Sequence, residues 1–364
     1  MSFLRALLSS ARPARRSPEP GSRLPTDDDL LLDAPDERIA PALVAAAQGT
    51  YAPASALLAA TRERAEWENR DRYTLRLAAF AHHRQDWLTD WLLAAPGDPD
   101  ALLVKAELEV SRALESPFPA DRLRPAGPLI DAAAAGAPCD PVPWRIALDH
   151  ARGTLAAHDT FEALWGQAVR RSSHHYGCHV AALKYLAAQG STHRECFDFA
   201  EQAAEDALPG SLIQALPVRA AFALLPGGAA WTPPAVQSTP SAVQLTARID
   251  RAADLAIALS AEYEPGDPWA AEVRNLLAYV LVSRERWTEA LEQFQLIGPY
   301  ATSFPWASPA VDTPAGDPLC RFLELRDAAQ SRAASRAAPE AGRTKPVGAR
   351  RWTPGRSRSD GHYA

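Results

Sequence analysis

Asp-Pro pairs ahead of apolar stretches constrain the fold of this chain more than any other feature. They occur at Asp98-Pro99, Asp140-Pro141, Asp267-Pro268 and Asp317-Pro318. Aspartate accepts the free backbone N–H groups at a helix start, and proline fits the next position because no N–H is needed there. Each pair therefore predicts a helix start. Thr192 and Glu195 predict another, because they have the spacing of a capping box.

Between these starts the apolar residues repeat with helical spacing, as in the stripes Leu75, Leu77, Ala78, Ala81 and Leu183, Leu186, Ala187. Strand signals are poor, because β-branched runs are scarce and no alternating segment is flanked by Asn-Gly or Asp-Gly. We expect roughly 12–15 helices joined by short turns. The predicted fold class is all-α, built from stacked antiparallel helix pairs.

Composition divides the chain into a flexible basic leader, two helical parts separated by a Pro/Gly-rich loop, and a disordered basic tail. The predicted bounds are 1–26 for the leader, 27–224 for the first helical part, 225–243 for the loop, 244–330 for the second helical part and 331–364 for the tail. The hydrophobic fraction of 47% is enough for a sizeable core, which excludes a chain that is disordered throughout.

Charge and apolar patterning limit the partners and the compartment. Of the net charge of −6, residues 26–330 carry −16 and both ends are positive. Nucleic acid is therefore not expected as a partner, except through the basic tail. No window approaches the 18 apolar residues of a membrane span, and Arg5 interrupts the apolar start that a secretory signal needs. We expect a cytoplasmic protein whose four cysteines are reduced thiols.

Residues 271–304 resemble a tetratricopeptide repeat. The matching large and small residues are Leu277, Ala278, Leu281, Ala290 and Phe294. Ile297 and Thr302 depart from the pattern, and residues 161–173 hold a weaker copy. The resemblance implies a tetratricopeptide-like superhelix that presents a concave surface to a peptide or protein, with an irregular all-α domain as the alternative.

A second resemblance rests on residues 174–191 and 199–222, which are similar to a family of uncharacterised, helical, repeat-containing actinobacterial proteins. The excess of 35 arginines over three lysines is also typical of a GC-rich genome. That family carries a tryptophan in the turn before Gly190-Ser191, where this chain has Ala188 and Gln189. The resemblance supports the fold and implies no activity.

Six histidines and cysteines lie close together in the sequence: His174, His175, Cys178, His179, His193 and Cys196. The periodicity predicts one helix over about 175–188 and the next over about 193–207, as an antiparallel hairpin. The two halves are then about 16 Å apart at 1.5 Å per residue, whereas zinc ligands lie about 2.0–2.3 Å from one ion. We predict no metal and no cofactor. His175 and His179 stay as candidate binding residues, with a packed pair as the alternative.

Tryptophans are the other candidate binding residues. Trp87 and Trp91 are four residues apart in a helical pattern, and Trp231 and Trp306 lie in Pro-rich segments. Each is either an aromatic anchor on a binding surface or a large ring that fills gaps between alanine-rich helices.

No catalytic signature is present, neither a G-x-S-x-G elbow, a phosphate-binding glycine loop, a G-x-G-x-x-G motif nor H-E-x-x-H. We therefore expect no catalytic residues, and a non-enzymatic interaction scaffold or adaptor for a basic or neutral peptide or protein. The alternative is an uncharacterised enzyme or metal-dependent module that uses residues 174–196. A third hypothesis is a regulatory protein whose body senses a small ligand while the basic tail contacts nucleic acid.

Overall fold

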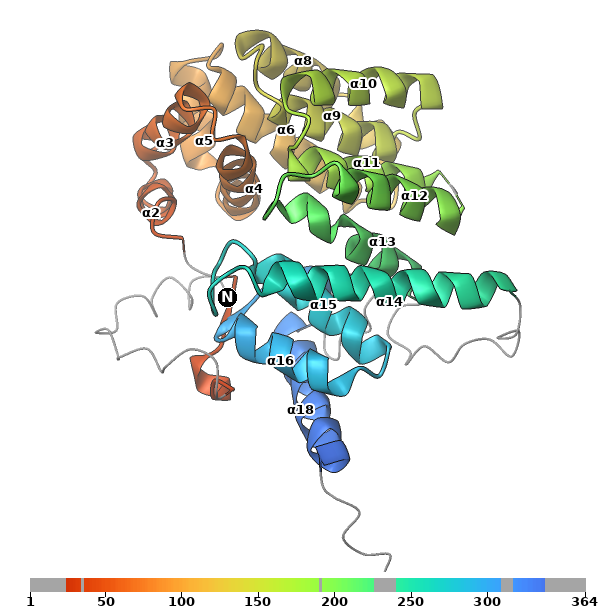
Figure 1. Ribbon diagram of the computed structural model, residues 1–364. Coiled ribbons are helices and arrows are strands. Elements are labelled where there is room, and N and C mark those ends of the chain that lie inside the picture. The colour runs from red at the N-terminus through yellow and green to blue at the C-terminus, as the bar shows by residue number, and fades with distance from the viewer. Residues whose placement is uncertain (1–23, 34–35, 190–191, 226–239, 309–316, 338–364) are drawn as a thin grey trace, which may run out of the picture.

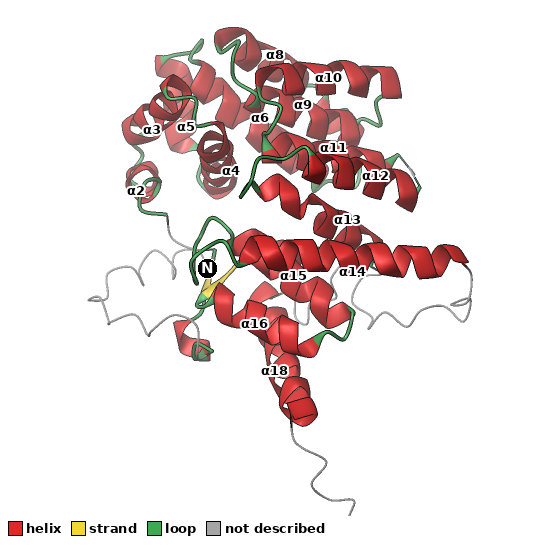
Figure 2. Ribbon diagram, in the orientation of Figure 1, coloured by secondary structure: helices red, strands yellow, loops and turns green. Residues whose placement is uncertain are grey.

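The computed structural model describes residues 24–33, 36–189, 192–225, 240–308 and 317–337, and it is mostly helical there (Figures 1 and 2). The all-α prediction is confirmed at this level. The described ranges contain seventeen α-helices, somewhat more than expected, because α7 and α17 have only five and four residues. No helix within these ranges is long and apolar enough to cross a membrane.

The α-helices of the first half are α2 Ala40–Ala47, α3 Ala52–Glu63, α4 Trp67–His83, α5 Asp86–Ala94, α6 Pro99–Leu114, α7 Pro119–Leu123, α8 Ala126–Gly136, α9 Val142–Gly153 and α10 His158–Arg171. Those of the second half are α11 Tyr176–Ala188, α12 His193–Glu205, α13 Leu216–Leu224, α14 Pro240–Ser260, α15 Ala271–Ser283, α16 Trp287–Ile297, α17 Ser303–Trp306 and α18 Pro318–Ala337. Two 3-10 helices, η1 Asp27–Asp29 and η2 Leu212–Ala215, and two short strands, β1 Leu31–Leu32 and β2 Tyr300–Ala301, complete the described elements.

The predicted helix starts are found, with one difference. The Asp98 carboxylate accepts the backbone N–H groups of the first turn of α6, and Asp140 and Asp317 act in the same way at α9 and α18. Asp267 also accepts a backbone N–H, 2.7 Å away, but α15 begins only at Ala271, because a turn comes between. The capping box of Thr192 and Glu195 is formed at the start of α12.

The helices pack as two rows. The first, which we call the inner row, consists of α4, α6, α9, α11, α13 and α15, and each of its helices contacts the next. The helices α5, α8, α10, α12, α14 and α16 alternate with them and pack on the other side. Figure 1 shows the stack continuing in chain order down to α18. One helix departs from this order, because α4 also contacts α9 and α11.

The predicted segment bounds need correction. A single core cluster joins Phe197 and Leu216 with Ile249 and Phe322, so the core continues across the segment 225–243. Helix α14 begins at Pro240, inside the predicted loop, and α18 extends to Ala337, inside the predicted tail. Both segments contain helix-forming residues beside the prolines on which the prediction depended.

Residues 24–33 bind to the C-terminal helices, although the predicted leader included 24–26. Strand β1 pairs in parallel with β2, with Leu31 opposite Tyr300 (Figure 2). The Arg326 guanidinium of α18 lies 2.6 Å from the Asp27 carboxylate, and the Ser303 amide donates to Asp33 across 2.8 Å. The N-terminal segment is therefore held against the C-terminal end of the stack.

A second contact joins the two ends of the inner row. The Arg72 guanidinium on α4 donates to the carbonyl oxygen of Pro268 across 2.9 Å and lies 5.0 Å from the centre of the Trp269 ring. Pro268 and Trp269 directly precede α15. Helix α4, the first of the inner row, therefore contacts the turn that precedes its last helix, which sequence periodicity does not indicate.

Candidate functional site

The predicted tryptophan anchors that the structure describes are buried. Trp87 and Trp91 are each 1% exposed between α2 and α6, and Trp91 donates from Nε1 to Asp98. Trp306 is fully buried, donates to Asn275 across 2.8 Å and packs against Phe322. These rings offer no surface to a partner, so they fill gaps between helices instead. Trp231 lies outside the described residues.

His175 is buried and caps helix α11. Its Nδ1 accepts the backbone N–H of Cys178 across 3.1 Å, and its Nε2 lies 3.3 Å from the carbonyl oxygen of Trp67 at the start of α4. An Nδ1 that accepts an amide proton carries none itself, so in this geometry Nε2 is the nitrogen that donates to Trp67. His175 therefore links α11 to α4.

His179 is buried one turn later on α11. Its Nδ1 lies 2.9 Å from the carbonyl oxygen of His175, and its ring meets the Trp165 ring edge to face, with centroids 5.0 Å apart. Burial lowers the pKa of His179, which favours a neutral ring. Among the described residues no three histidine, cysteine or acidic side chains come together in a group that could hold a metal ion.

Replacing His175 by alanine should destabilise the protein by about 1–3 kcal/mol, because the cap of α11 is lost and the Trp67 carbonyl loses its donor. The substitution His175→Asn should cost less, since an asparagine side chain caps a helix start well. Urea denaturation of both variants measures the difference. Equal losses for the two variants would show that the cap contributes nothing.

Two buried arginines connect the inner row. Arg70 donates to Asp140 across 2.5 Å, to Asp100 across 2.6 Å and to the carbonyl oxygen of Leu58 across 2.8 Å. Because Asp100 and Asp140 lie at the starts of α6 and α9, this one side chain holds α4 against both helices.

The second buried arginine, Arg145 on α9, binds Asp71 of α4 across 2.7 Å and Glu107 of α6 across 2.5 Å. The Asp71 side chain also lies close to the α11 backbone, since a Cβ on Gly177 of α11 would lie 2.0 Å from the Asp71 carboxylate. Helix α4 thus packs tightly against both α9 and α11.

Next to these networks lies a group of charged side chains that we call the inner polar cluster: Arg72, Asp149, Arg152, Lys184, Arg219 and Glu272. Arg152 lies 3.2 Å from Asp149 within α9, and Arg219 of α13 lies 2.8 Å from Glu272 of α15. Lys184 of α11 interacts electrostatically with both pairs, and Arg72 of α4 with Glu272. Five helices of the inner row, namely α4, α9, α11, α13 and α15, supply the cluster with four cations and two carboxylates.

Lys184 is the exposed member of the cluster. Desolvation by the surrounding protein nevertheless lowers the pKa of Lys184. Desolvation likewise lowers the pKa of Arg72, whose side chain is half-buried.

Sequence reasoning missed this cluster and the buried arginines. One signal was available, because Arg70 lies on the same helical stripe as Thr74, Leu77 and Ala81, all of which are buried. A charged residue on an apolar stripe indicates a buried ion pair. Lys184 gives no comparable signal, since its surroundings come from helices distant in the sequence.

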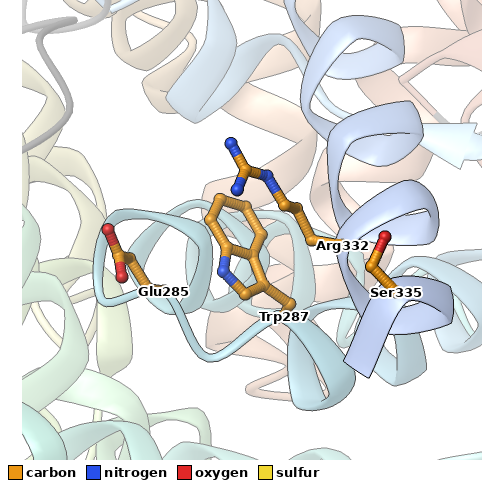
Figure 3. A pocket seen from close by; sticks show the side chains of 4 residues that line it. All are labelled: Glu285, Trp287, Arg332 and Ser335. Carbon is orange, nitrogen blue, oxygen red and sulfur yellow. The ribbon is translucent and has the colours of Figure 1, made fainter. Parts of the chain in front are cut away.

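Two further hollows lie elsewhere on the surface. A cavity of about 220 Å³ is lined by Glu285, Trp287, Arg332 and Ser335, with the Arg332 guanidinium over the Trp287 ring (Figure 3). A second, of about 410 Å³, is lined by His82, Arg112, Glu115, Ser116, Pro117 and Arg122. Neither contains a residue that the sequence predicted as a binding residue. The polar lining groups already have partners, since Arg332 stacks on Trp287, Ser335 donates to Ser331, and Arg112 donates to the carbonyl oxygen of His82.

Comparison of the chain with models of protein families, with curated proteins and with solved structures found no match in any of the three.

Proposed function

We propose that this chain is a non-enzymatic interaction scaffold, with tetratricopeptide-like helix pairs, that binds a peptide or protein partner at the inner polar cluster. The observation that carries the proposal is the gathering of charged side chains from five helices around Lys184, which is exposed. Lys184 is accessible to a partner, whereas the guanidinium groups of Arg70 and Arg145 are buried and bound to carboxylates.

The local charge defines the partner more closely than the net charge does. The cluster has two more cations than carboxylates, although the body as a whole is acidic. Complementarity favours an acidic or neutral segment of the partner at this point. The expectation of a basic partner came from the net charge of the body, which averages over surfaces that the partner does not touch.

The pattern of small and large residues in 271–304 supports the tetratricopeptide-like part of the proposal. Ala278 of α15 and Ala290 of α16 are fully buried where the two helices pack, and Phe294 fills the space beside them. This is the packing that the resemblance implies. Helix α4 differs from such a pattern, because it covers part of the inner side of α9 and α11.

The histidine and cysteine segment gives the enzymatic alternative no comparable support. His175 and His179 lie 3.3 Å or less from backbone carbonyl oxygens, and Cys178 is buried beneath them. A nucleophile or a metal ligand needs an accessible lone pair. These side chains instead connect α11 to its neighbours.

The test is cross-linking in the source cell with mass spectrometry, comparing the wild type with Lys184→Glu and Arg194→Glu. Charge reversal at Lys184 should reduce the captured partner about tenfold, which corresponds to about 1.4 kcal/mol. Arg194 is 85% exposed on α12, away from the cluster, so its reversal should leave capture unchanged. The absence of any enriched partner, or equal capture by both variants, would contradict the proposal.

A further inference from the structure

Residues 24–33, which we call the N-terminal strap, contact the C-terminal helices through few side chains. Figure 1 shows η1 of the strap in red, below α2 and beside those helices. Leu30 is the one buried residue of the strap and belongs to the same core cluster as Phe322. Leu32, on the same face of an extended chain, packs against that cluster, whereas residues 26–29 are exposed.

The backbone of the strap adds a strand to β2. The Leu31 amide donates to the carbonyl oxygen of Pro299 across 2.8 Å, and the Asp33 amide donates to that of Ala301 across 2.6 Å. Backbone hydrogen bonds of this kind bind an extended segment, and pockets for alternate side chains give the specificity. The strap is therefore bound in the way that sheet edges bind peptides.

Two carboxylates of the strap are bound by the C-terminal helices. Asp27 lies 2.6 Å from the guanidinium group of Arg326, whose side chain is 7% exposed. Arg326 also donates to Asp327 of its own helix, which orients the guanidinium group. Asp33 accepts the Ser303 amide across 2.8 Å and the Ser303 hydroxyl across 2.5 Å. Donors for two carboxylates thus flank an apolar surface for leucines.

The strap can leave this surface without unfolding the core. Leu30 is its one buried residue, and the Asp27 side chain is 66% exposed. Asp33 makes a further ion pair with Arg76 of α4, 3.2 Å away, but the Arg76 side chain is 37% exposed, and exposed pairs contribute little. The core cluster beneath the strap consists, apart from Leu30, mainly of residues from α11 to α18.

We propose that the surface beneath the strap binds an extended, acidic, leucine-containing segment of a partner protein, and that the strap competes with this segment for the surface. The surface, which we call the strap site, is formed by Pro299, Tyr300, Ala301, Ser303 and Arg326. It shares no residue with the inner polar cluster and is a second peptide site.

A partner segment fits the strap site better than the strap of a second copy does. The strap of the same chain is linked to its site, so its effective concentration there is high. A second copy offers identical contacts without that advantage. A partner segment with leucines and carboxylates at the strap's spacing is not limited to identical contacts, so it can displace the strap.

The test uses the full-length chain with Leu30→Glu, which should release the strap because a carboxylate would otherwise be buried among apolar side chains. The probe is a fluorescein-labelled peptide with the sequence of residues 24–33, which stands in for the partner segment. Fluorescence anisotropy should show at least tenfold tighter binding to L30E than to the wild type. Circular dichroism checks that L30E keeps its helices, and the double variant D27A, D33A, which retains Leu30, should also bind the peptide more tightly than the wild type.

Specificity is tested in the L30E background. Adding Arg326→Gln should weaken peptide binding several-fold, whereas Arg332→Gln, on the same helix but stacked on Trp287, should leave it unchanged. A peptide with glutamate in place of its buried leucine should not bind. No binding to either strap variant, or equal binding of the two peptides, would overturn the proposal. Dimers of the wild type in sedimentation velocity that L30E abolishes would assign the site to a second copy and overturn the assignment to a partner.

Discussion

Replacing Arg70 by methionine should lower the free energy of unfolding by about 3–5 kcal/mol. Methionine leaves the Asp140 carboxylate without its guanidinium partner and the Asp100 carboxylate with Arg62 alone, 3.2 Å away, and both aspartate side chains are at most 2% exposed. A loss of this size is a large fraction of the stability of an ordinary domain, which is about 5–15 kcal/mol. Urea denaturation followed by circular dichroism measures the loss.

The matched control is Arg64→Met. Arg64 pairs with Glu66 across 2.9 Å, but its side chain is 58% exposed, so the change should cost less than about 1 kcal/mol. The triple variant R70M, D100N, D140N should recover part of the stability, because it removes the unpaired charges. Similar losses for R70M and R64M would show that the buried network contributes no more than a surface pair.

The effect of Arg70→Met should also depend on pH. Burial is the largest influence on Asp100 and raises its pKa, while Arg70 opposes it. Removing Arg70 removes the strongest influence that lowers the pKa of Asp100, so the pKa of Asp100 in the folded variant should lie further above its value in the unfolded chain. The stability of the variant should therefore rise as the pH falls from 7 toward 5, since the folded state then binds more protons than the unfolded one.

Local sequence signals predicted the helices because those signals act over a few residues. Asp98 and Thr192 cap helices with their own side chains, so the boundary depends on nothing distant. The stripe around Ala278 and Ala290 similarly predicted the packing of adjacent helices. Such features can be read from a single sequence, because the interacting groups are close along the chain.

The contacts that close the stack could not be predicted in this way. Arg72 meets Pro268 across 196 positions, and Arg326 meets Asp27 across 299. Periodicity in the sequence cannot predict that such distant residues meet. Their distance in the folded chain depends on how every helix between them is rotated against the next. The inner polar cluster has the same origin, because its residues come from helices that are distant in the sequence.

Replacing Gly177 by alanine should destabilise the protein by about 2–4 kcal/mol. The added Cβ would lie 2.0 Å from the Asp71 carboxylate, and Asp71 cannot move away without losing its 2.7 Å ion pair with Arg145. The substitution therefore tests whether α4 packs against α11 as closely as the structure shows. Thermal and urea denaturation of the variant measure the loss.

Gly127→Ala is the control for the change of residue type. Gly127 also lies in a helix, α8, but nothing is within 4 Å of the position that its Cβ would occupy. Alanine there should stabilise the protein by up to about 1 kcal/mol, because it restricts the unfolded chain and favours the helix. A loss of stability for Gly177→Ala together with a gain for Gly127→Ala would therefore point to the contact between α4 and α11 as the cause of the loss. A stabilising effect of alanine at Gly177 would mean that α4 and α11 do not pack as closely as the structure shows.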